Sequence, residues 1–258
     1  MLFELRGIAC VLNVKPIKEG FTKVQVIGSK TIKKTGEVAR DISGARWINL
    51  SGGQADWWAS KGDEMKHAIV SVVADAVTDS YNDKFFENYR AIDFDIIAWP
   101  DKAKGIKTTL MGLSGTGRIL NIRPVSEGFT KIQVINSEKY KEKENTCTRW
   151  LSINGNLANW YTENANKVKG ATVQFRTKAV TDTKTKGDDV KYFDSYRSDK
   201  CDIVVWAKSK QDSNQGVDTQ QQYAEYDEPP MGFAEPDLDV EAGQFYQDLA
   251  QYNELPPQ

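Results

Sequence analysis

The chain alternates apolar and polar residues in short runs, and one such phrase occurs twice. "EGFTKVQVI" occupies positions 19–27 and "EGFTKIQVI" occupies positions 127–135. An alternation with a period of two predicts a β-strand that is buried on one face. Residues 2–29 match residues 110–137 without a gap. A match of this length predicts that the chain contains two copies of one domain.

The match resumes further along, so the repeat covers a whole domain. "RWINLSG" at 46–52 corresponds to "RWLSING" at 149–155, and "FFENYRAIDFDIIAW" at 85–99 corresponds to "YFDSYRSDKCDIVVW" at 192–206. Length differences fall between these blocks, as expected for loops. We therefore expect the following organisation: a first domain at 1–100, a linker at 101–109, a second domain at 110–210 and a tail at 211–258.

Within each copy the patterns predict three strands, a short helix and two further strands. In the first copy the strands are expected at 8–14, 21–27, 47–50, 68–77 and 92–99, and the helix at 55–65. This order is typical of the OB-fold, a five-stranded Greek-key barrel whose ligand face lies on strands 2 and 3. The predicted fold class is all-β with short helices: two tandem OB-fold barrels and a disordered acidic tail. A five-stranded sandwich is the structural alternative.

The second and third strands should turn their β-branched residues inward and a mixed aromatic, cationic and amide face outward. Such a face suits a base to stack, a phosphate to neutralise and a base edge to hydrogen-bond. An alternative is that the strand-3 tryptophans pack under a loop. We expect Trp57 and Trp160, on the helix, to pack in the core. The outward residues are Phe21, Lys23, Gln25, Trp47 and Asn49, and in the second copy Phe129, Lys131, Gln133, Trp150 and Ser152.

Basic residues interleaved with aromatics also occur in the connection between the last two strands of each copy. This mixture fits a single strand better than a duplex, because a duplex hides the faces of its bases. A hairpin stabilised by its own aromatic pairs is the alternative. The further candidate residues for binding single-stranded DNA are Lys33, Lys34, Arg46, Lys84, Phe86, Tyr89 and Arg90, with Arg149, Lys191, Phe193, Tyr196 and Arg197.

Charge is distributed unevenly although the net charge is only −2. Positions 211–258 hold eleven acidic residues and no Lys or Arg, which leaves 34 basic and 25 acidic residues before them, a net charge of +9. A basic body favours a polyanionic partner. The tail is poor in aliphatic residues, so it cannot bury enough apolar surface to offset the entropy of ordering, and we expect it to be disordered.

Candidate chemistry is sparse. The three cysteines are far apart in sequence, the one histidine is His67, and no phosphate-binding glycine motif occurs. We therefore expect no enzyme activity, no cofactor and no metal site. No apolar run is long enough to span a membrane and no signal peptide precedes the first strand, so we expect a cytoplasmic protein without a membrane partner.

With these residues in place, the chain resembles the bacterial single-stranded DNA-binding protein (SSB) family. "ARWINLSG" and "TRWLSING" look like the third strand of that family, which opens with a base-stacking Trp, and "DEPPMGFAEPDLD" at 227–239 looks like its acidic tip. The resemblance implies sequence-tolerant binding of single-stranded DNA in replication, recombination or repair. A phage or plasmid origin, with action in the host cytoplasm, would fit. The alternatives are an RNA-binding protein of the same fold and a protein-interaction scaffold.

Two features depart from the family pattern. Two domains are fused, as in a minority of members that dimerise, so a homodimer is possible. The acidic tip is followed by "VEAGQFYQDLAQYNELPPQ", in which the spacing of Phe245, Leu249 and Tyr252 is helical and could form a short partner-binding helix. The resemblance implies that the tail recruits replication and repair proteins, and the tail residues expected to do so are Pro229, Pro230, Met231, Phe233, Asp237, Asp239, Phe245 and Leu249.

Overall fold

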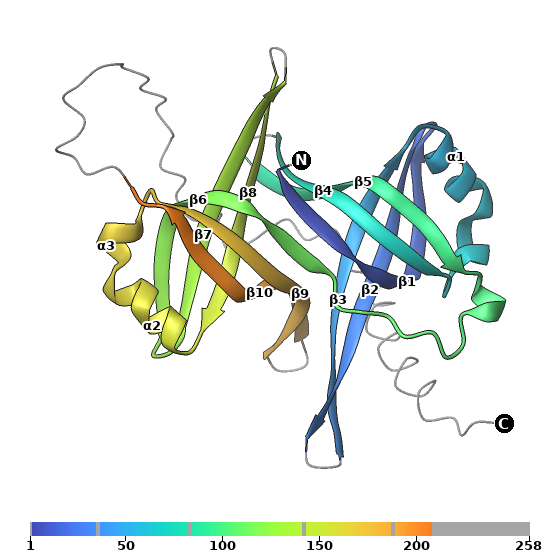
Figure 1. The fold of residues 1–258 in the computed structure, drawn as a ribbon. Coiled ribbons are helices and arrows are strands. Elements are labelled where there is room, and N and C mark those ends of the chain that lie inside the picture. The colour runs from blue at the N-terminus through green and yellow to red at the C-terminus, as the bar shows by residue number, and fades with distance from the viewer. Residues whose placement is uncertain (1, 35–36, 82–83, 141–142, 187–188, 208–258) are drawn as a thin grey trace. The chain divides into compact units, whose positions relative to one another are not determined.

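The computed structural model describes residues 2–34, 37–81, 84–140, 143–186 and 189–207, most of them in strands, with a few short helices (Figure 1). The predicted all-β class is thereby confirmed. Positions 211–258, and with them every residue proposed for partner binding, lie outside the described residues. The described chain divides into two units: one comprises 2–79 with 87–207, and the other is the segment Ser80–Phe86.

Equivalent elements follow each other in the same order in both copies. The first copy comprises β1 (Phe3–Lys18), β2 (Phe21–Lys34), β3 (Glu37–Ser51), α1 (Gly52–Lys61), the 3-10 turn η1 (Gly62–Met65), β4 (Ile69–Tyr81) and β5 (Lys84–Ala98). After the turn η2 (Pro100–Lys102), the second copy comprises β6 (Gly112–Ser126), β7 (Phe129–Tyr140), β8 (Lys143–Asn154), α2 (Asn156–Glu163), α3 (Ala165–Val168), β9 (Thr172–Lys186) and β10 (Asp189–Val205).

Strand pairing closes each copy into a circuit. In the first copy β1 pairs with β2, β2 with β3, β3 with β5, β5 with β4, and β4 again with β1. The second copy repeats this circuit as β6, β7, β8, β10 and β9. The contact between β3 and β5 is parallel and is limited to the pair Asn49 and Arg90. This pair brings β3 beside the N-terminal half of β5.

The two circuits join through antiparallel pairing of β1 with β6. Leu5 pairs with Leu113, which is its own equivalent in the second copy, and both side chains are fully buried. The pairs on either side are reciprocal, because Glu4 faces Ser114 and Arg6 faces Gly112. Such self-complementary pairing is the pattern of a two-fold symmetric dimer interface. Here it lies within one chain.

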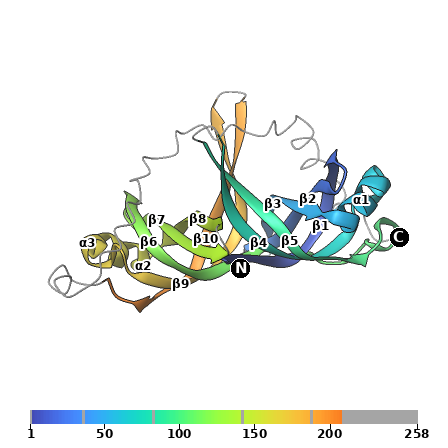
Figure 2. The same ribbon diagram turned by 90° about the horizontal axis from the view of Figure 1, so that it is seen from above.

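Helices cover the ends of the circuits away from this junction (Figure 2). In α1 the buried face holds Ala55 and Trp58, which are three positions apart and so share one side of the helix. Tyr161 takes the same place in α2. The expectation that Trp57 and Trp160 pack in the core is wrong. One position along a helix turns a side chain by about 100°, and both indoles are 38% exposed.

Candidate nucleic-acid interface

Four of the residues predicted from the first copy meet around one cleft of about 430 Å³. Phe21 and Lys23 come from β2, Asn49 from β3 and Arg90 from β5. Strand register explains the meeting, since Lys23 pairs with Asn49 and Asn49 pairs with Arg90. We call this site the first cleft. Its remaining lining residues are Leu50, Ser51, Asp79, Asn88 and Ala91.

A chain of polar contacts runs along one side of the first cleft. Arg90 Nη2 lies 2.9 Å from Asp79 Oδ1, and the Asn88 amide donates to Asp79 Oδ2 at 2.8 Å. A carboxylate only accepts, so Asn88 must present its carbonyl oxygen to Asn49, whose amide donates to it at 3.4 Å. The Asn49 carbonyl oxygen is then left without a partner among the described residues. Asp79 therefore orders both a cation and two amides.

The second copy builds a related surface with different polar groups. Lys131 is exposed on β7 and pairs in register with Ser152, which in turn pairs with Arg197. Arg197 forms an ion pair with Asp182, and the hydroxyl oxygens of Ser152 and Ser195 are 3.4 Å apart. Hydroxyls thus replace the two amides of the first cleft. Ser152 itself is buried, so the exposure predicted for its side chain is wrong.

The strand-3 tryptophans are half-buried, so neither indole is sealed inside the protein. Trp47 pairs in register with Gln25, and Trp150 pairs with Gln133. We expect both glutamine side chains to be exposed, and that expectation is wrong because both are buried. Asn13, on the neighbouring strand β1, donates its amide to the Gln25 side chain at 2.7 Å, and Asn121 does the same for Gln133.

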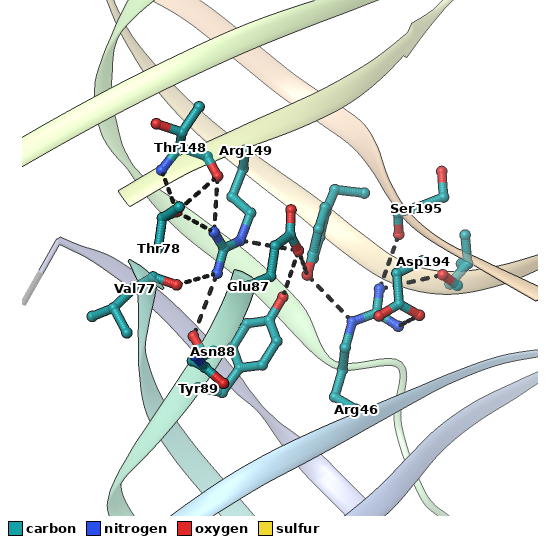
Figure 3. A network of polar contacts seen from close by, with 12 residues as sticks. Arg46, Val77, Thr78, Glu87, Asn88, Tyr89, Thr148, Arg149, Asp194 and Ser195 are labelled. Atoms are coloured by element: carbon teal, nitrogen blue, oxygen red, sulfur yellow. Dashed lines mark hydrogen bonds and ion pairs between the residues drawn. The ribbon is translucent and has the colours of Figure 1, made fainter. Parts of the chain in front are cut away.

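Four residues predicted to contact nucleic acid lie instead where the two copies meet; Figure 3 labels Arg46, Tyr89 and Arg149, and the fourth is Tyr196. Arg46 and Arg149 are 1% and 0% exposed, and Tyr89 and Tyr196 are 3% and 2% exposed. Each arginine reaches into the other copy, where its guanidinium carbon lies over a tyrosine ring. The distances to the ring centroids are 5.0 Å from Arg46 to Tyr196 and 5.3 Å from Arg149 to Tyr89. The predicted surface positions of all four are therefore wrong.

Arg149 binds both strands of the first copy's β4–β5 hairpin. Its guanidinium donates to the Thr78 hydroxyl at 2.9 Å and to the Val77 carbonyl at 3.0 Å on β4, and to the Asn88 carbonyl at 3.4 Å on β5. Its Nε lies 3.3 Å from the Glu87 carboxylate, an ion pair without hydrogen-bond geometry.

Arg46 makes the equivalent contacts in the second copy. It forms an ion pair with Asp194 at 2.7 Å, and it donates to the carbonyl oxygens of Val180 and Ser195, both at 3.3 Å. Its Nε donates to the Tyr196 hydroxyl, also at 3.3 Å. The two arginines thus use corresponding residues of opposite copies.

Electrostatics keeps the buried guanidinium groups charged. Burial alone would lower the pKa of Arg149, but the neighbouring Glu87 carboxylate outweighs burial and raises that pKa. Burial also acts to lower the pKa of Arg46, but the neighbouring Asp194 carboxylate outweighs burial, so this pKa is raised as well. Burial also raises the pKa of the Tyr89 hydroxyl, which favours the neutral phenol. Glu87 accepts hydrogen bonds from Tyr89 and from Tyr196, each at 3.4 Å, and so joins the two halves.

The remaining predicted residues are distributed as follows. Phe129 and Phe86 are half-buried, the latter in the separate segment Ser80–Phe86, and Phe193 is 46% exposed. Side chains outside the described set are those of Lys33, Lys34, Lys84 and Lys191. The tail residues Pro229, Pro230, Met231, Phe233, Asp237, Asp239, Phe245 and Leu249 also fall outside it.

Sequence reasoning missed the acidic and hydroxyl partners of the arginines. Glu87, Asp194 and Thr78 look like ordinary polar residues of a hairpin, because nothing in one copy shows which side faces the other copy. A weak signal existed: the acid that precedes the hairpin tyrosine by two positions is retained as Glu87 and Asp194, and the arginine before each strand-3 tryptophan is retained as well.

All three cysteines are free, and burial raises the pKa of Cys10 and Cys201 to about 11 and that of Cys147 to about 12, which disfavours the reactive thiolate form. No cluster of three or more metal-binding side chains occurs among the described residues. None of the described helices is long and apolar enough to cross a membrane.

Comparison with solved structures finds the same fold in a single-stranded DNA-binding protein from Thermus aquaticus. A deletion variant of that protein aligns with a TM-score of 0.57 at 13% identity, over 85% of this chain and 98% of the other. The wild-type protein aligns with the same TM-score and identity, over 81% and 96% of the two chains. No protein-family model matches the chain, and no curated protein matches it in sequence.

Proposed function

We propose that this protein binds single-stranded DNA with little sequence preference, through two tandem OB-fold domains at 1–100 and 110–210 joined by a linker at 101–109. The first cleft is the observation that supports this most directly. It gathers an aromatic ring, two cations and two amides on strands β2, β3 and β5, where an OB-fold takes its ligand. The likeness of the fold to a single-stranded DNA-binding protein supports the same proposal.

Binding combines charge neutralisation with stacking. Lys23 and Arg90 in the first copy, and Lys131 and Arg197 in the second, neutralise phosphates, and each phosphate contact makes the salt dependence of log K steeper by about 0.7. Trp47 and Trp150 offer the faces on which bases stack, which any base can do. Because the copies are covalently linked, binding at one raises the effective concentration of DNA at the other.

The acidic tail at 211–258 has a separate role in the proposal. Its acidic, Pro- and Phe-containing segment recruits proteins of replication, recombination or repair, as the family resemblance implies, and its negative charge competes weakly with DNA for the basic surfaces. Two chains associate as a homodimer, and the protein acts in the cytoplasm, where single-stranded DNA is exposed.

Titration of the full chain with oligo-dT of increasing length, followed by intrinsic Trp fluorescence, tests the proposal. We expect quenching, and affinity that rises in two steps as the oligomer first fills one copy and then reaches the other. Matched oligo-U and duplex DNA serve as comparisons. Tighter binding of RNA would favour an RNA-binding protein, and no quenching by any oligomer would favour a protein-interaction scaffold.

A further inference from the structure

Each buried arginine holds a part of the opposite copy from which the proposed binding surface is built. Arg149 belongs to the second copy, but it binds the carbonyl groups of Val77 and Asn88 in the first. Two positions beyond Val77 lies Asp79, which orders the first cleft, and the side chain of Asn88 lines that cleft. One guanidinium therefore fixes both backbone segments that carry the Asp79–Asn88 contact.

The opposite half repeats this arrangement. Arg46, from the first copy, binds the carbonyl groups of Val180 and Ser195 in the second. Asp182 follows Val180 by two positions, and Ser195 supplies a hydroxyl beside Ser152. In these hydrogen bonds each arginine binds the backbone of the opposite copy, so each copy supports the proposed binding surface of the other.

We infer that Arg149 is a positioning residue for the first cleft and Arg46 is a positioning residue for the surface of the second copy. The inference deepens the proposed function and rests on it. The planar guanidinium can donate hydrogen bonds to two strands at once in a fixed geometry. A lysine ammonium at the same place cannot reproduce that arrangement of donors. Because each arginine is buried, water cannot replace the lost contacts.

A purely structural role predicts a different outcome. If the arginines only hold the two copies together, loss of either one would weaken DNA binding by both copies alike. Crosswise positioning predicts that each substitution damages one surface, and that this surface lies in the copy which does not contain the substitution.

The experiment uses the full chain with one surface disabled at a time. Trp47→Ala with Lys23→Ala leaves only the second copy functional, and Trp150→Ala with Lys131→Ala leaves only the first. Arg149→Lys and Arg46→Lys are each placed in both backgrounds, so that the two arginines serve as matched controls for each other. Affinity for a short oligo-dT that spans one copy is measured by fluorescence.

With only the first copy functional, Arg149→Lys should weaken binding by about tenfold, the worth of a hydrogen bond from a charged group, while Arg46→Lys changes it by less than about threefold. With only the second copy functional, the order reverses. Equal effects of the two substitutions in both backgrounds would overturn the inference. Arg149→Gln and Arg46→Gln provide a second matched pair if a lysine variant does not fold.

A measurement without DNA separates the inference from the proposed function. Amide hydrogen exchange should rise at 87–90 in Arg149→Lys and at 194–197 in Arg46→Lys, each in the copy that lacks the substitution. If the unsubstituted full chain does not bind oligo-dT, the proposed function fails, and hydrogen exchange that rises only in the opposite copy would still establish crosswise positioning by the two arginines. If either substitution raised hydrogen exchange equally at 87–90 and at 194–197, crosswise positioning would be refuted, whatever the result with DNA.

Discussion

At the scale of single residues, the side chain on the neighbouring strand decides whether a polar group is exposed. Lys23 and Gln25 lie on the same face of β2, yet only Lys23 reaches the first cleft. Gln25 stands opposite Asn13, whose amide binds it, and Gln133 stands opposite Asn121 in the same way. Lys23 stands opposite Lys15, a like charge that cannot pair with it. Alternation therefore gives the face of a residue but not its exposure.

Substitution of a strand-3 tryptophan tests stacking directly. Trp47→Ala or Trp150→Ala should each weaken oligo-dT binding by about 1–3 kcal/mol, the worth of one stacked base, which corresponds to roughly 5- to 150-fold. Competition binding, read with a labelled oligomer, avoids the lost Trp signal. Trp57→Ala, on the outer face of α1, is the control and should change affinity by less than about twofold. An unchanged affinity for both strand-3 variants would refute the stacking model.

The buried arginines should also matter for stability. Arg149→Ala removes the guanidinium that binds Glu87 and two carbonyl groups, and because the Glu87 side chain is 28% exposed we expect a cost of about 3 kcal/mol, the low end for a broken buried ion pair. Arg90→Ala also removes an ion pair, with Asp79, but its side chain is 45% exposed, so we expect a cost of about 1 kcal/mol or less. Urea unfolding followed by circular dichroism measures both. A cost of Arg149→Ala as small as the cost expected for Arg90→Ala would mean that the contact between the copies contributes little to stability.

At the scale of elements, the copies approach each other where one strand lacks a side chain. A Cβ added to Gly44, on β3, would lie 2.3 Å from the carbonyl oxygen of Ala179, on β9. The neighbour is backbone, so it cannot swing away as a flexible side chain would. The second copy has Cys147 at the position equivalent to Gly44, and this thiol is fully buried. The two sides of the junction therefore pack differently around a shared pattern of hydrogen bonds.

Gly44→Ala should destabilise the protein by about 1–3 kcal/mol, as overpacking of a close contact does. Gly53→Ala is the matched control, because a Cβ there meets nothing within 4 Å and Ala favours the helix α1. Thermal unfolding of both variants provides the comparison. A melting temperature for Gly44→Ala equal to that of the parent would show that β3 and β9 can separate at no cost.

Much of the element order could be predicted from the sequence, and the junction could not. The repeat and the period-two runs predict five strands and a helix in each copy, because burial of one face of a strand makes apolar and polar residues alternate along it. The pairing of β1 with β6 leaves no such pattern, since Leu5 and Leu113 would be apolar in any buried strand. Arg46 and Arg149 were misplaced for the same reason. Beside an outward tryptophan, an arginine is as consistent with phosphate binding as with a buried ion pair.

At the scale of the whole molecule, charge is separated along the chain. The net charge is +9 before position 211, and the eleven acidic residues beyond it have no basic neighbours. Opposite charges on one chain attract each other most at low ionic strength, because salt screens them over about 10 Å at 0.1 M. The tail should therefore compete with DNA when salt is low and have little influence when salt is high.

Removal of 211–258 should tighten oligo-dT binding at low salt, and the difference from the full chain should shrink as salt is added. Fluorescence titrations at several salt concentrations follow this convergence. A chain whose tail acids are replaced by Asn and Gln separates charge from bulk, and it should behave as the truncated chain does. Equal affinity of the truncated and full chains at low salt would reject competition by the tail.

The reciprocal pairing around Leu5 and Leu113 also bears on how such a protein can diverge. In an assembly of two identical chains, every mutation arises on both sides of the axis together and must be tolerated twice. Here each side has its own codons, so Asn49 can remain an amide while its counterpart is Ser152, and Gly44 can face a different neighbour from Cys147. With both copies in one chain, the two halves can therefore diverge in sequence while the pairing of β1 with β6 is kept.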